Sequence, residues 1–307
     1  MNAAADSPHD HRAAPLMRRA AAISVVVSGG LVAIKAFAYF ASHSVAMLAS
    51  LADSALDLFT SSLTMFAIHQ ALTPADADHR FGHGKAEPLA GLAQAAFITA
   101  SALFLVIQAV NRILAPEPLD NSVPALLVMC VAIACAIGLI LYERRVVAAT
   151  GSVALDADKA HYLGDLVTNI GVVLALLLSA YAGWSLADPI IAILVALVMV
   201  FTAWGVGRVS LDQLMDRELP QDTRARIIAI VRSHDGVRSL HDLKTRQAGR
   251  SVFIQVHLDM DPNMRLMDAH ALSDAVEYDL MAAFPGAEVI IHQDPAGYEV
   301  VDTNALH

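Results

Sequence analysis

The chain has 307 residues, of which 56% are hydrophobic and only 16% are charged, and its formal net charge is −10. A soluble globular protein usually has about 25% charged residues, and a nucleic-acid-binding protein has a basic patch or a high pI. The composition therefore excludes a single soluble globule and intrinsic disorder, and it argues against a nucleic-acid partner. Residues 1–213 contain 26 charged residues and residues 214–307 contain 24, so we expect a membrane part followed by a soluble part.

Six apolar stretches in the first part are long enough to cross a bilayer as helices, because a span needs about 20 mostly apolar residues. A β-barrel is not expected, since the alternating pattern of its strands is missing. A cleaved signal peptide is the alternative for the first stretch, but such apolar regions usually have only about 7–15 residues. The six predicted spans are Arg19–Phe40, Val45–Leu72, Pro88–Leu114, Val123–Tyr142, Val153–Tyr181 and Pro189–Arg208. We expect residues 1–17 to form a disordered tail and residues 18–213 to form a six-helix transmembrane domain.

The basic residues predict the orientation of these spans. They lie before the first span, between the second and third, between the fourth and fifth, and after the sixth. The opposite loops, residues 41–44, 115–122 and 182–188, contain no lysine or arginine. The positive-inside rule then places both termini in the cytoplasm, and the soluble part with them.

The soluble part, residues 214–297, has the pattern of a small α+β domain. Its expected order is helix, strand, strand, helix, strand, which is typical of a ferredoxin-like αββαβ layer. The expected elements are Thr223–His234, Leu240–Gln247, Ser251–Asp259, Met264–Phe284 and Ala287–His292. Residues 298–307 are expected to be a C-terminal tail.

Two of the predicted spans contain ionisable residues at helical spacing. Asp53 and Asp57 are four residues apart on the second span, and His161 and Asp165 repeat this spacing on the fifth, so each pair lies on one helical face. Carboxylates in hydrocarbon repel one another or become protonated unless a cation joins them. Three carboxylates and one imidazole make a four-coordinate ligand set for Zn²⁺ or a similar divalent ion. A helix–helix hydrogen-bond network is the alternative, but it explains one buried acid better than two matched pairs.

The loop between the second and third spans offers a second group of ligands. Asp76, His79 and His83 lie in it, and Gly82 and Gly84 allow a tight backbone there. Two histidines in such a loop are more often simply solvated, so this pattern alone is a weak indication of a cation site.

A third group of metal-ligand residues lies in the soluble part. His292 and Asp294 are two residues apart and would point to the same face of a strand. His241, His257 and His270 complete a set of five, and their separation in sequence means that only the fold or a dimer interface can bring them together. Scattered surface histidines are the alternative.

Taken together, these motifs resemble those of the cation diffusion facilitator family of divalent-metal efflux transporters. The similarity lies in residues 44–57 of the second span, the loop segment Phe81–Glu87, the pair His161 and Asp165, and the terminal segment Ile290–Pro295. The last segment is similar to the end of bacterial zinc and ferrous-iron efflux members. The resemblance extends from about Arg18 to Pro295, nearly the whole chain.

The resemblance implies a fold, a dimer and three metal sites. The fold is a six-helix membrane domain followed by a cytoplasmic metallochaperone-like αββαβ domain, and the protein works as a homodimer. The transport site would be formed by Asp53, Asp57, His161 and Asp165, and the loop site by Asp76, His79 and His83. A binuclear site that bridges the dimer would be formed by His241, His257, His270, His292 and Asp294.

The resulting hypothesis is a transporter, not an enzyme, in the bacterial inner membrane. It exports Zn²⁺, with Fe²⁺ or Cd²⁺ as further candidates, in exchange for protons, and its soluble domain senses metal and dimerises. The partners are a second copy of the chain, the lipid bilayer and protons as counter-ion. An intramembrane hydrolase or a membrane metal receptor without transport is the alternative. The hydrolase lacks H-E-x-x-H and G-x-S-x-G motifs, and the receptor would not need the charged pairs in the spans.

Overall fold

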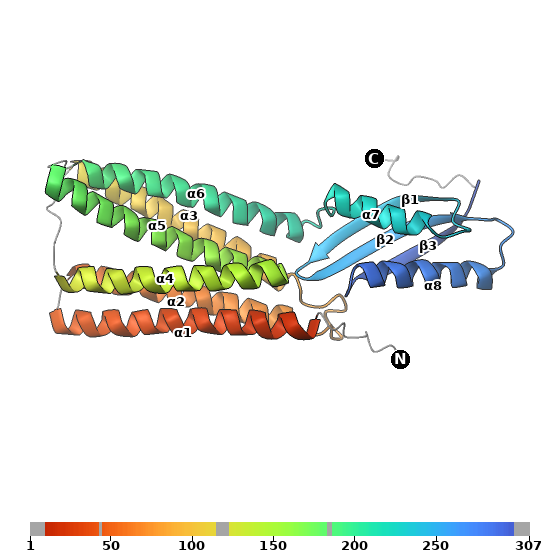
Figure 1. The fold of residues 1–307 in the computed structure, drawn as a ribbon, viewed down its shortest axis with the longest axis horizontal. Coiled ribbons are helices and arrows are strands. Elements are labelled where there is room, and N and C mark those ends of the chain that lie inside the picture. Colours follow the sequence, from red (N-terminus) through yellow and green to blue (C-terminus); the bar gives the residue numbers. More distant parts are fainter. Residues whose placement is uncertain (1–9, 43–44, 115–122, 183–185, 298–307) are drawn as a thin grey trace. The chain divides into compact units, whose positions relative to one another are not determined.

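The fold of the protein is described by a computed structural model over residues 10–42, 45–114, 123–182 and 186–297 (Figure 1). The chain divides into two compact units, one over residues 12–214 and one from residue 215 onward. The first is entirely helical and the second contains a small sheet, so the two units correspond to different fold classes.

Long helices make up the first unit (Figure 1). They are α1 (Asp10–Ser42), α2 (Val45–Ala71), α3 (Ala86–Leu114), α4 (Val123–Thr150), α5 (Val153–Ala182) and α6 (Ala187–Leu214). The helix α1 begins at Asp10, whereas the sequence predicts a disordered tail up to residue 17. The chain is helical from Asp10 because Ala13 and Met17 already bury their side chains, which gives this turn packing partners. Residues 1–9 of the expected tail lie outside the described residues, as do residues 298–307 of the expected C-terminal tail.

Four of these helices contain a segment long and apolar enough to cross a membrane. The segments are Ala13–Phe40, Ser50–Ala71, Ala86–Leu114 and Pro189–Leu214. Within the described residues, α4 and α5 do not contain such a segment, so four of the six predicted spans are supported. The helix α5 contains the charged residues Asp156, Asp158, Lys159 and Asp165, which lower its mean hydropathy. In α4 only the side chains from Met129 onward are described, so the part of this helix that could be assessed as a span is shorter than the helix itself.

The outer surface of the helical unit is apolar and its interior is built from small side chains. Phe104, Phe201 and Trp204 are exposed, as expected for side chains that face lipid. Between α3, α5 and α6 the buried residues include many alanines, and small residues let membrane helices approach closely. At Gly91 a Cβ atom would collide with Ser210 Oγ and lie 3.3 Å from a methyl group of Val153. The close approach of α3 to α5 and α6 therefore requires glycine there.

The second unit has the order α7 (Gln221–Arg232), β1 (Ser239–Ala248), β2 (Ser251–Met260), α8 (Leu266–Ala283) and β3 (Glu288–Pro295). This order confirms the predicted αββαβ pattern. The sheet order is β1-β2-β3; β1 is antiparallel to β2, and β3 is parallel to β2.

The core of the second unit lies on one face of its sheet. Ile254, Val256 and Leu258 of β2 are buried in one cluster with side chains of α7 and α8, among them Ile227 and Val276. Because successive side chains of a strand point to opposite faces, the residues between them belong to the other face. That opposite face is available for polar side chains, and it holds one of the candidate sites.

Candidate metal sites

The ionisable residues of α2 and α5 come together inside the helical unit. His161 Nε2 lies 3.1 Å from Asp57 Oδ1 and 3.7 Å from Asp165 Oδ2. The ligand atoms of these three residues all lie within 4.8 Å of one another, which is close enough to hold one metal ion. We call Asp57, His161 and Asp165 the membrane triad. Asp165 follows His161 by one helical turn, and Asp57 reaches the same point from the neighbouring helix.

Burial makes the membrane triad a site of unusual chemistry. The side chain of His161 is only 8% exposed and that of Asp57 is 20% exposed. Nε2 of His161 faces two carboxylates at once, so a proton on this nitrogen satisfies both. A divalent cation that takes its place needs deprotonated ligands. The arrangement can therefore bind either a proton or a metal ion, but not both at the same nitrogen.

The fourth predicted ligand of this site, Asp53, is not part of the triad. It lies one turn before Asp57 on α2 and its side chain is exposed. Lys35 on α1 is close enough to interact electrostatically with Asp53, Asp57 and Asp165, and its Nζ donates a hydrogen bond to the backbone oxygen of Ser50 at 3.1 Å. Lys35 thus places a cationic side chain beside the acidic group. Lys35 is not among the residues predicted from the sequence, although a lysine within the apolar stretch 19–40 is itself the signal.

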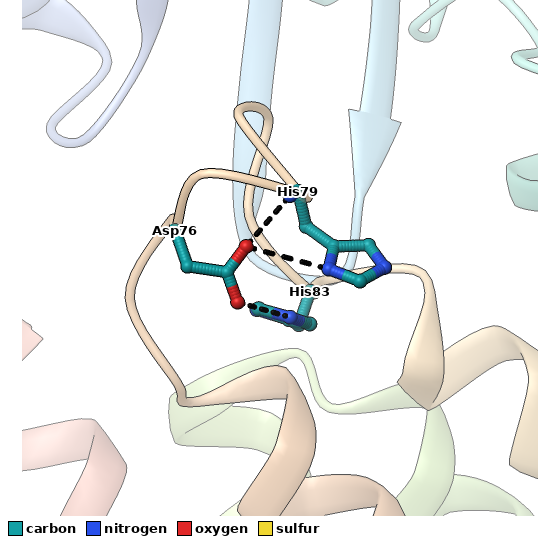
Figure 2. Close-up of side chains that lie close together, drawn as sticks. All are labelled: Asp76, His79 and His83. Atoms are coloured by element: carbon teal, nitrogen blue, oxygen red, sulfur yellow. Dashed lines mark hydrogen bonds and ion pairs between the residues drawn. The ribbon is translucent and has the colours of Figure 1, made fainter.

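The loop between α2 and α3 brings together all three of its predicted ligands (Figure 2). We call Asp76, His79 and His83 the loop triad. Asp76 Oδ1 lies 3.4 Å from His79 Nδ1, and Asp76 Oδ2 lies 3.4 Å from His83 Nε2. The two imidazole rings have their centroids 4.5 Å apart. The intervening turn requires a left-handed residue, and Gly82 supplies it with a φ of 76°.

The local backbone of the loop also fixes the charge of its carboxylate. The backbone N–H groups of His79 and Asp78 donate hydrogen bonds of 2.6 and 2.9 Å to Asp76 Oδ1. The hydrogen bond from His79 is the main reason why the pKa of Asp76 is lowered from its ordinary value. Asp76 is therefore anionic at any physiological pH, as a metal ligand must be.

Strand register explains how the histidines of the second unit come together. His241 of β1 is the register partner of His257 of β2, and His257 is the register partner of His292 of β3. Neighbouring strands lie about 4.8 Å apart, and the ring centroids are 5.0 Å apart in the first pair and 4.6 Å in the second. We call these three histidines, with Asp294, the sheet row.

Asp294 is the hub of the sheet row. Its Oδ2 lies 2.8 Å from His257 Nδ1 and 3.6 Å from His241 Nε2, and its Oδ1 lies 3.3 Å from His292 Nε2. His241, His257 and Asp294 have ligand atoms close enough to hold one ion, whereas His292 is 62% exposed and stands at the edge of the group. His270 lies apart on α8, where it is 61% exposed and pairs with Asp274 at 3.5 Å.

Two further carboxylates, which are not among the residues predicted from the sequence, lie against the sheet row. Asp259 Oδ2 lies 3.4 Å from His241 Nδ1, and Asp242 Oδ2 lies 3.8 Å from His257 Nε2. The pKa of Asp242 is lowered, chiefly by the hydrogen bond that it accepts from Lys244. The sequence contains a signal for Asp259, because His257 and Asp259 repeat the two-residue spacing of His292 and Asp294. No comparable signal exists for Asp242, which follows His241 at an irregularity of the sheet register and has a φ of 45°.

Comparison with known families agrees with this geometry. Residues 21–215 match the model of the cation efflux transmembrane domain, and residues 219–296 match the model of the cation efflux protein cytoplasmic domain. The chain belongs to the cation diffusion facilitator family of cation efflux proteins. Membership makes it a helical membrane protein with a C-terminal cytoplasmic domain, and a transporter by family. The name of the second model, ZT_dimer, indicates that this domain dimerises.

Individual relatives cover nearly the whole chain. The cation-efflux pump FieF of Shewanella oneidensis is 46% identical over 92% of this chain and 95% of its own length. FieF of Escherichia fergusonii is 42% identical over 91% and 93%. A solved structure of the putative zinc transporter CzrB in its zinc form is 35% identical and covers 28% of this chain and 98% of its own, with a TM-score of 0.26.

Proposed function

We propose that this member of the family exports a divalent metal ion from the cytosol in exchange for protons, with Zn²⁺ as the first candidate and Fe²⁺ or Cd²⁺ as the next. The observation that supports this most is the position of His161 Nε2, 3.1 Å from Asp57 and 3.7 Å from Asp165. An imidazole and two carboxylates suit a zinc-like ion, and the relatives named FieF and CzrB are a cation-efflux pump and a putative zinc transporter.

Asp53 is proposed as the fourth ligand of this site. It shares a face of α2 with Asp57, one turn away, so a rotation of α2 or a change of its own rotamer would bring it to the ion. As a third aspartate, in place of a softer ligand, Asp53 would suit iron beside zinc. Asp53 would then be the ligand that joins and leaves the ion during transport.

Proton exchange follows from the competition for the same atoms. Metal that arrives from the cytosol must displace protons from the membrane triad, because only deprotonated ligands coordinate. If protons and metal are mutually exclusive, each stabilises a different conformation of the site, which is what coupled exchange requires. We propose that α2 and α5 form the gate of this alternating access.

The remaining sites are proposed to act in the cytoplasm. The loop triad would bind a further ion where α2 meets α3. The sheet row would sense cytosolic metal and hold two protomers together, with Asp294 as a bridge between two ions. His270 would contribute to this binuclear site from its place on α8.

The proposed topology has six spans over residues 18–213 and a cytoplasmic domain over residues 214–297, with both termini in the cytoplasm. The proposed location is the bacterial inner membrane. The family matches to residues 21–215 and 219–296 and the division of the structure near residue 214 support it.

Flux in reconstituted vesicles tests the proposed transport. We expect zinc uptake into acid-inside proteoliposomes, accompanied by proton release, and a loss of at least about tenfold in the Asp57→Asn variant, because even outer-shell partners of metal sites are worth about 10–100-fold. Asp222→Asn, which removes the same charge from an exposed position of α7, is the matched control. Full proton-driven uptake by Asp57→Asn would overturn the proposal. Metal binding without any flux in the parent protein would indicate a receptor.

A further inference from the structure

Two acidic side chains outside the three candidate sites are completely buried. Glu143 on α4 and Asp158 on α5 have no exposed surface. They lie within hydrogen-bonding range of each other, although they come from different helices. Neither residue belongs to the membrane triad, and no role proposed above uses them.

The surroundings of this acidic pair satisfy only half of its oxygen atoms. Ser24 Oγ donates a hydrogen bond of 2.6 Å to Glu143 Oε1, and Gln94 Nε2 donates one of 3.0 Å to Asp158 Oδ1. Ser61 Oγ also donates to Asp158 Oδ1, at 3.4 Å. Glu143 Oε2 and Asp158 Oδ2 are buried and have no donor among the described residues. A buried acceptor without a donor is costly, so these two oxygen atoms favour a proton or a cation between them.

Cationic side chains do not neutralise the acidic pair. Within the described part of the chain, no lysine, arginine or histidine forms an ion pair with Glu143 or Asp158, and the groups that face them from α1, α2 and α3 are uncharged serines and a glutamine. Three titratable groups face the pair from α5, and each is engaged elsewhere. Lys159 pairs with Asp156, His161 contacts Asp57 and Asp165, and the hydroxyl of Tyr162 shares hydrogen bonds of 2.6 and 2.7 Å with Ser28 and Ser61.

Two adjacent carboxyl groups without a cation cannot both be ionised in a low-dielectric interior, and a shared proton resolves the conflict. We propose that Glu143 and Asp158 form a buried proton-binding site that holds one shared proton and is separate from the membrane triad. The proton makes one carboxyl group a donor to the other, so that a free oxygen gains a partner and the pair has a single negative charge. It also joins α4 to α5 and, through Ser24, to α1.

The proposed proton-binding site lies close to the membrane triad. On α5, Asp158 precedes His161 by three residues, and on α2, Ser61, which donates to Asp158, follows Asp57 by four, so Asp158 lies about one helical turn from the membrane triad. Loss of the proton would place two like charges in contact and would push α4 away from α5. The proton is held whether or not metal occupies the membrane triad, and in this respect the inference goes beyond the proposed exchange.

Infrared spectroscopy of the full-length protein in a detergent without carbonyl groups tests this inference, because lipid esters absorb in the same region as protonated carboxyl groups. The sample is saturated with Zn²⁺ at neutral pH, so that carboxylates which coordinate metal are deprotonated, and the carbonyl stretch of protonated carboxyl groups is recorded. We expect a band that is lost in Glu143→Gln, because the amide replaces the protonated acid as donor to Asp158. Glu288→Gln, at an exposed position of β3, is the matched control and should keep the band.

Four outcomes of these measurements would contradict the inference. A parent protein without the band, or a band that persists in Glu143→Gln, would overturn it. A loss of one bound zinc ion per protomer in Glu143→Gln would show that the pair holds a metal ion instead of a proton. If Glu143→Gln does not fold, Asp158→Asn replaces it, and there the band must shift in frequency because its hydrogen-bond acceptor has changed; an unshifted band would also overturn the inference. None of these readouts depends on flux, so failure here leaves the proposed transport untouched.

Discussion

The Nε2 atom of His161 is the point at which ionisable side chains of α2 and α5 meet. It is buried between the carboxylates of Asp57 and Asp165, and each of these groups is costly to keep charged in hydrocarbon. Whatever occupies the space beside Nε2 determines the charge of the whole group. In the proposed exchange, this single histidine would link the protonation of the site to its metal content.

The carboxylate of Asp76 gives a prediction that depends on pH. Its pKa is lowered because the backbone N–H of His79 donates to it. A lowered pKa in the folded state means that this hydrogen bond stabilises the loop fully above the ordinary aspartate pKa of about 3.9, and that the stabilisation is lost as the pH falls through the lowered value. We expect the His79 amide to stay protected from hydrogen exchange from neutral pH down to about pH 4 and to lose protection below it.

Asp76→Asn is the informative variant for that measurement, because an amide oxygen can accept the same hydrogen bond without titrating. Protection of the His79 amide should then be weaker near neutral pH but independent of acid. Asp78→Asn, at an exposed position of the same loop, should behave as the parent. Acid-dependent protection that survives in Asp76→Asn would contradict the assignment.

At the residue scale, the sequence was sufficient to predict most of the ionisable side chains that come together, but not all of them. Asp57, His161 and Asp165 could be predicted because ionisable residues in apolar helices stand out and helical spacing gives their face. Asp53 has the same spacing, yet it lies outside the membrane triad, since spacing does not reveal how far along its axis a neighbouring helix crosses. Glu143 was missed because it lies just beyond the predicted span 123–142, where a charge is usually explained by the interface.

Among the elements, the strands of the second unit show why register matters for a metal site. His241, His257 and His292 are register partners across three strands, and a shift of one residue would turn a strand's histidine toward the apolar core. The alternating core residues Ile254, Val256 and Leu258 prevent that shift, because it would expose them. The hydrophobic alternation can be predicted from the sequence, and by fixing the register it also determines which residues form the sheet row.

For the helices, the close contact at Gly91 gives a prediction about stability. A methyl group there would meet Ser210 and Val153, so we expect Gly91→Ala to destabilise the helical unit by about 1–3 kcal/mol, the usual cost of overpacking. Thermal unfolding of the purified protein in detergent measures it.

Gly138→Ala is the matched control for this experiment. Nothing lies within 4 Å of a Cβ atom at Gly138 of α4, and alanine is the better helix former by about 1 kcal/mol. This variant should be at least as stable as the parent. Equal destabilisation by both substitutions would show that helix backbone, and not the packing of α3 on α5 and α6, causes the effect.

On the scale of the whole molecule, a membrane unit and a cytoplasmic unit each hold their own candidate metal ligands. The charge distribution along the sequence was sufficient to predict this division, and strand patterns were sufficient for the αββαβ order. The number of spans was harder to predict, because the charged residues of α5 lower its mean hydropathy, and α5 is not among the four helices with a described segment apolar enough to cross a membrane.

The sheet row gives a prediction about cooperation between the units. The double variant His241→Ala and His292→Ala should bind fewer zinc ions per protomer, because both residues contact Asp294. If the row is a sensor, flux at saturating zinc should be retained while more zinc is needed for half-maximal flux. Metal titration and vesicle flux on the same preparation measure the two effects.

His234→Gln is the control, since it removes an imidazole that pairs with Asp279 outside the row. It should bind the parent's number of ions. An unchanged metal content in the double variant would refute the assignment of the row, and complete loss of flux at saturating zinc would place the row on the transport path.

The direction in which the sheet row runs has a mechanical consequence. It crosses the strands instead of following one of them, so an ion bound there would fasten β1, β2 and β3 at one level. The parallel strand β3 pairs with the sheet only through β2, so it can separate without breaking the pair of β1 and β2. Bound metal would thus oppose the separation of β3 from the sheet, and removal of the metal by a chelator would favour it.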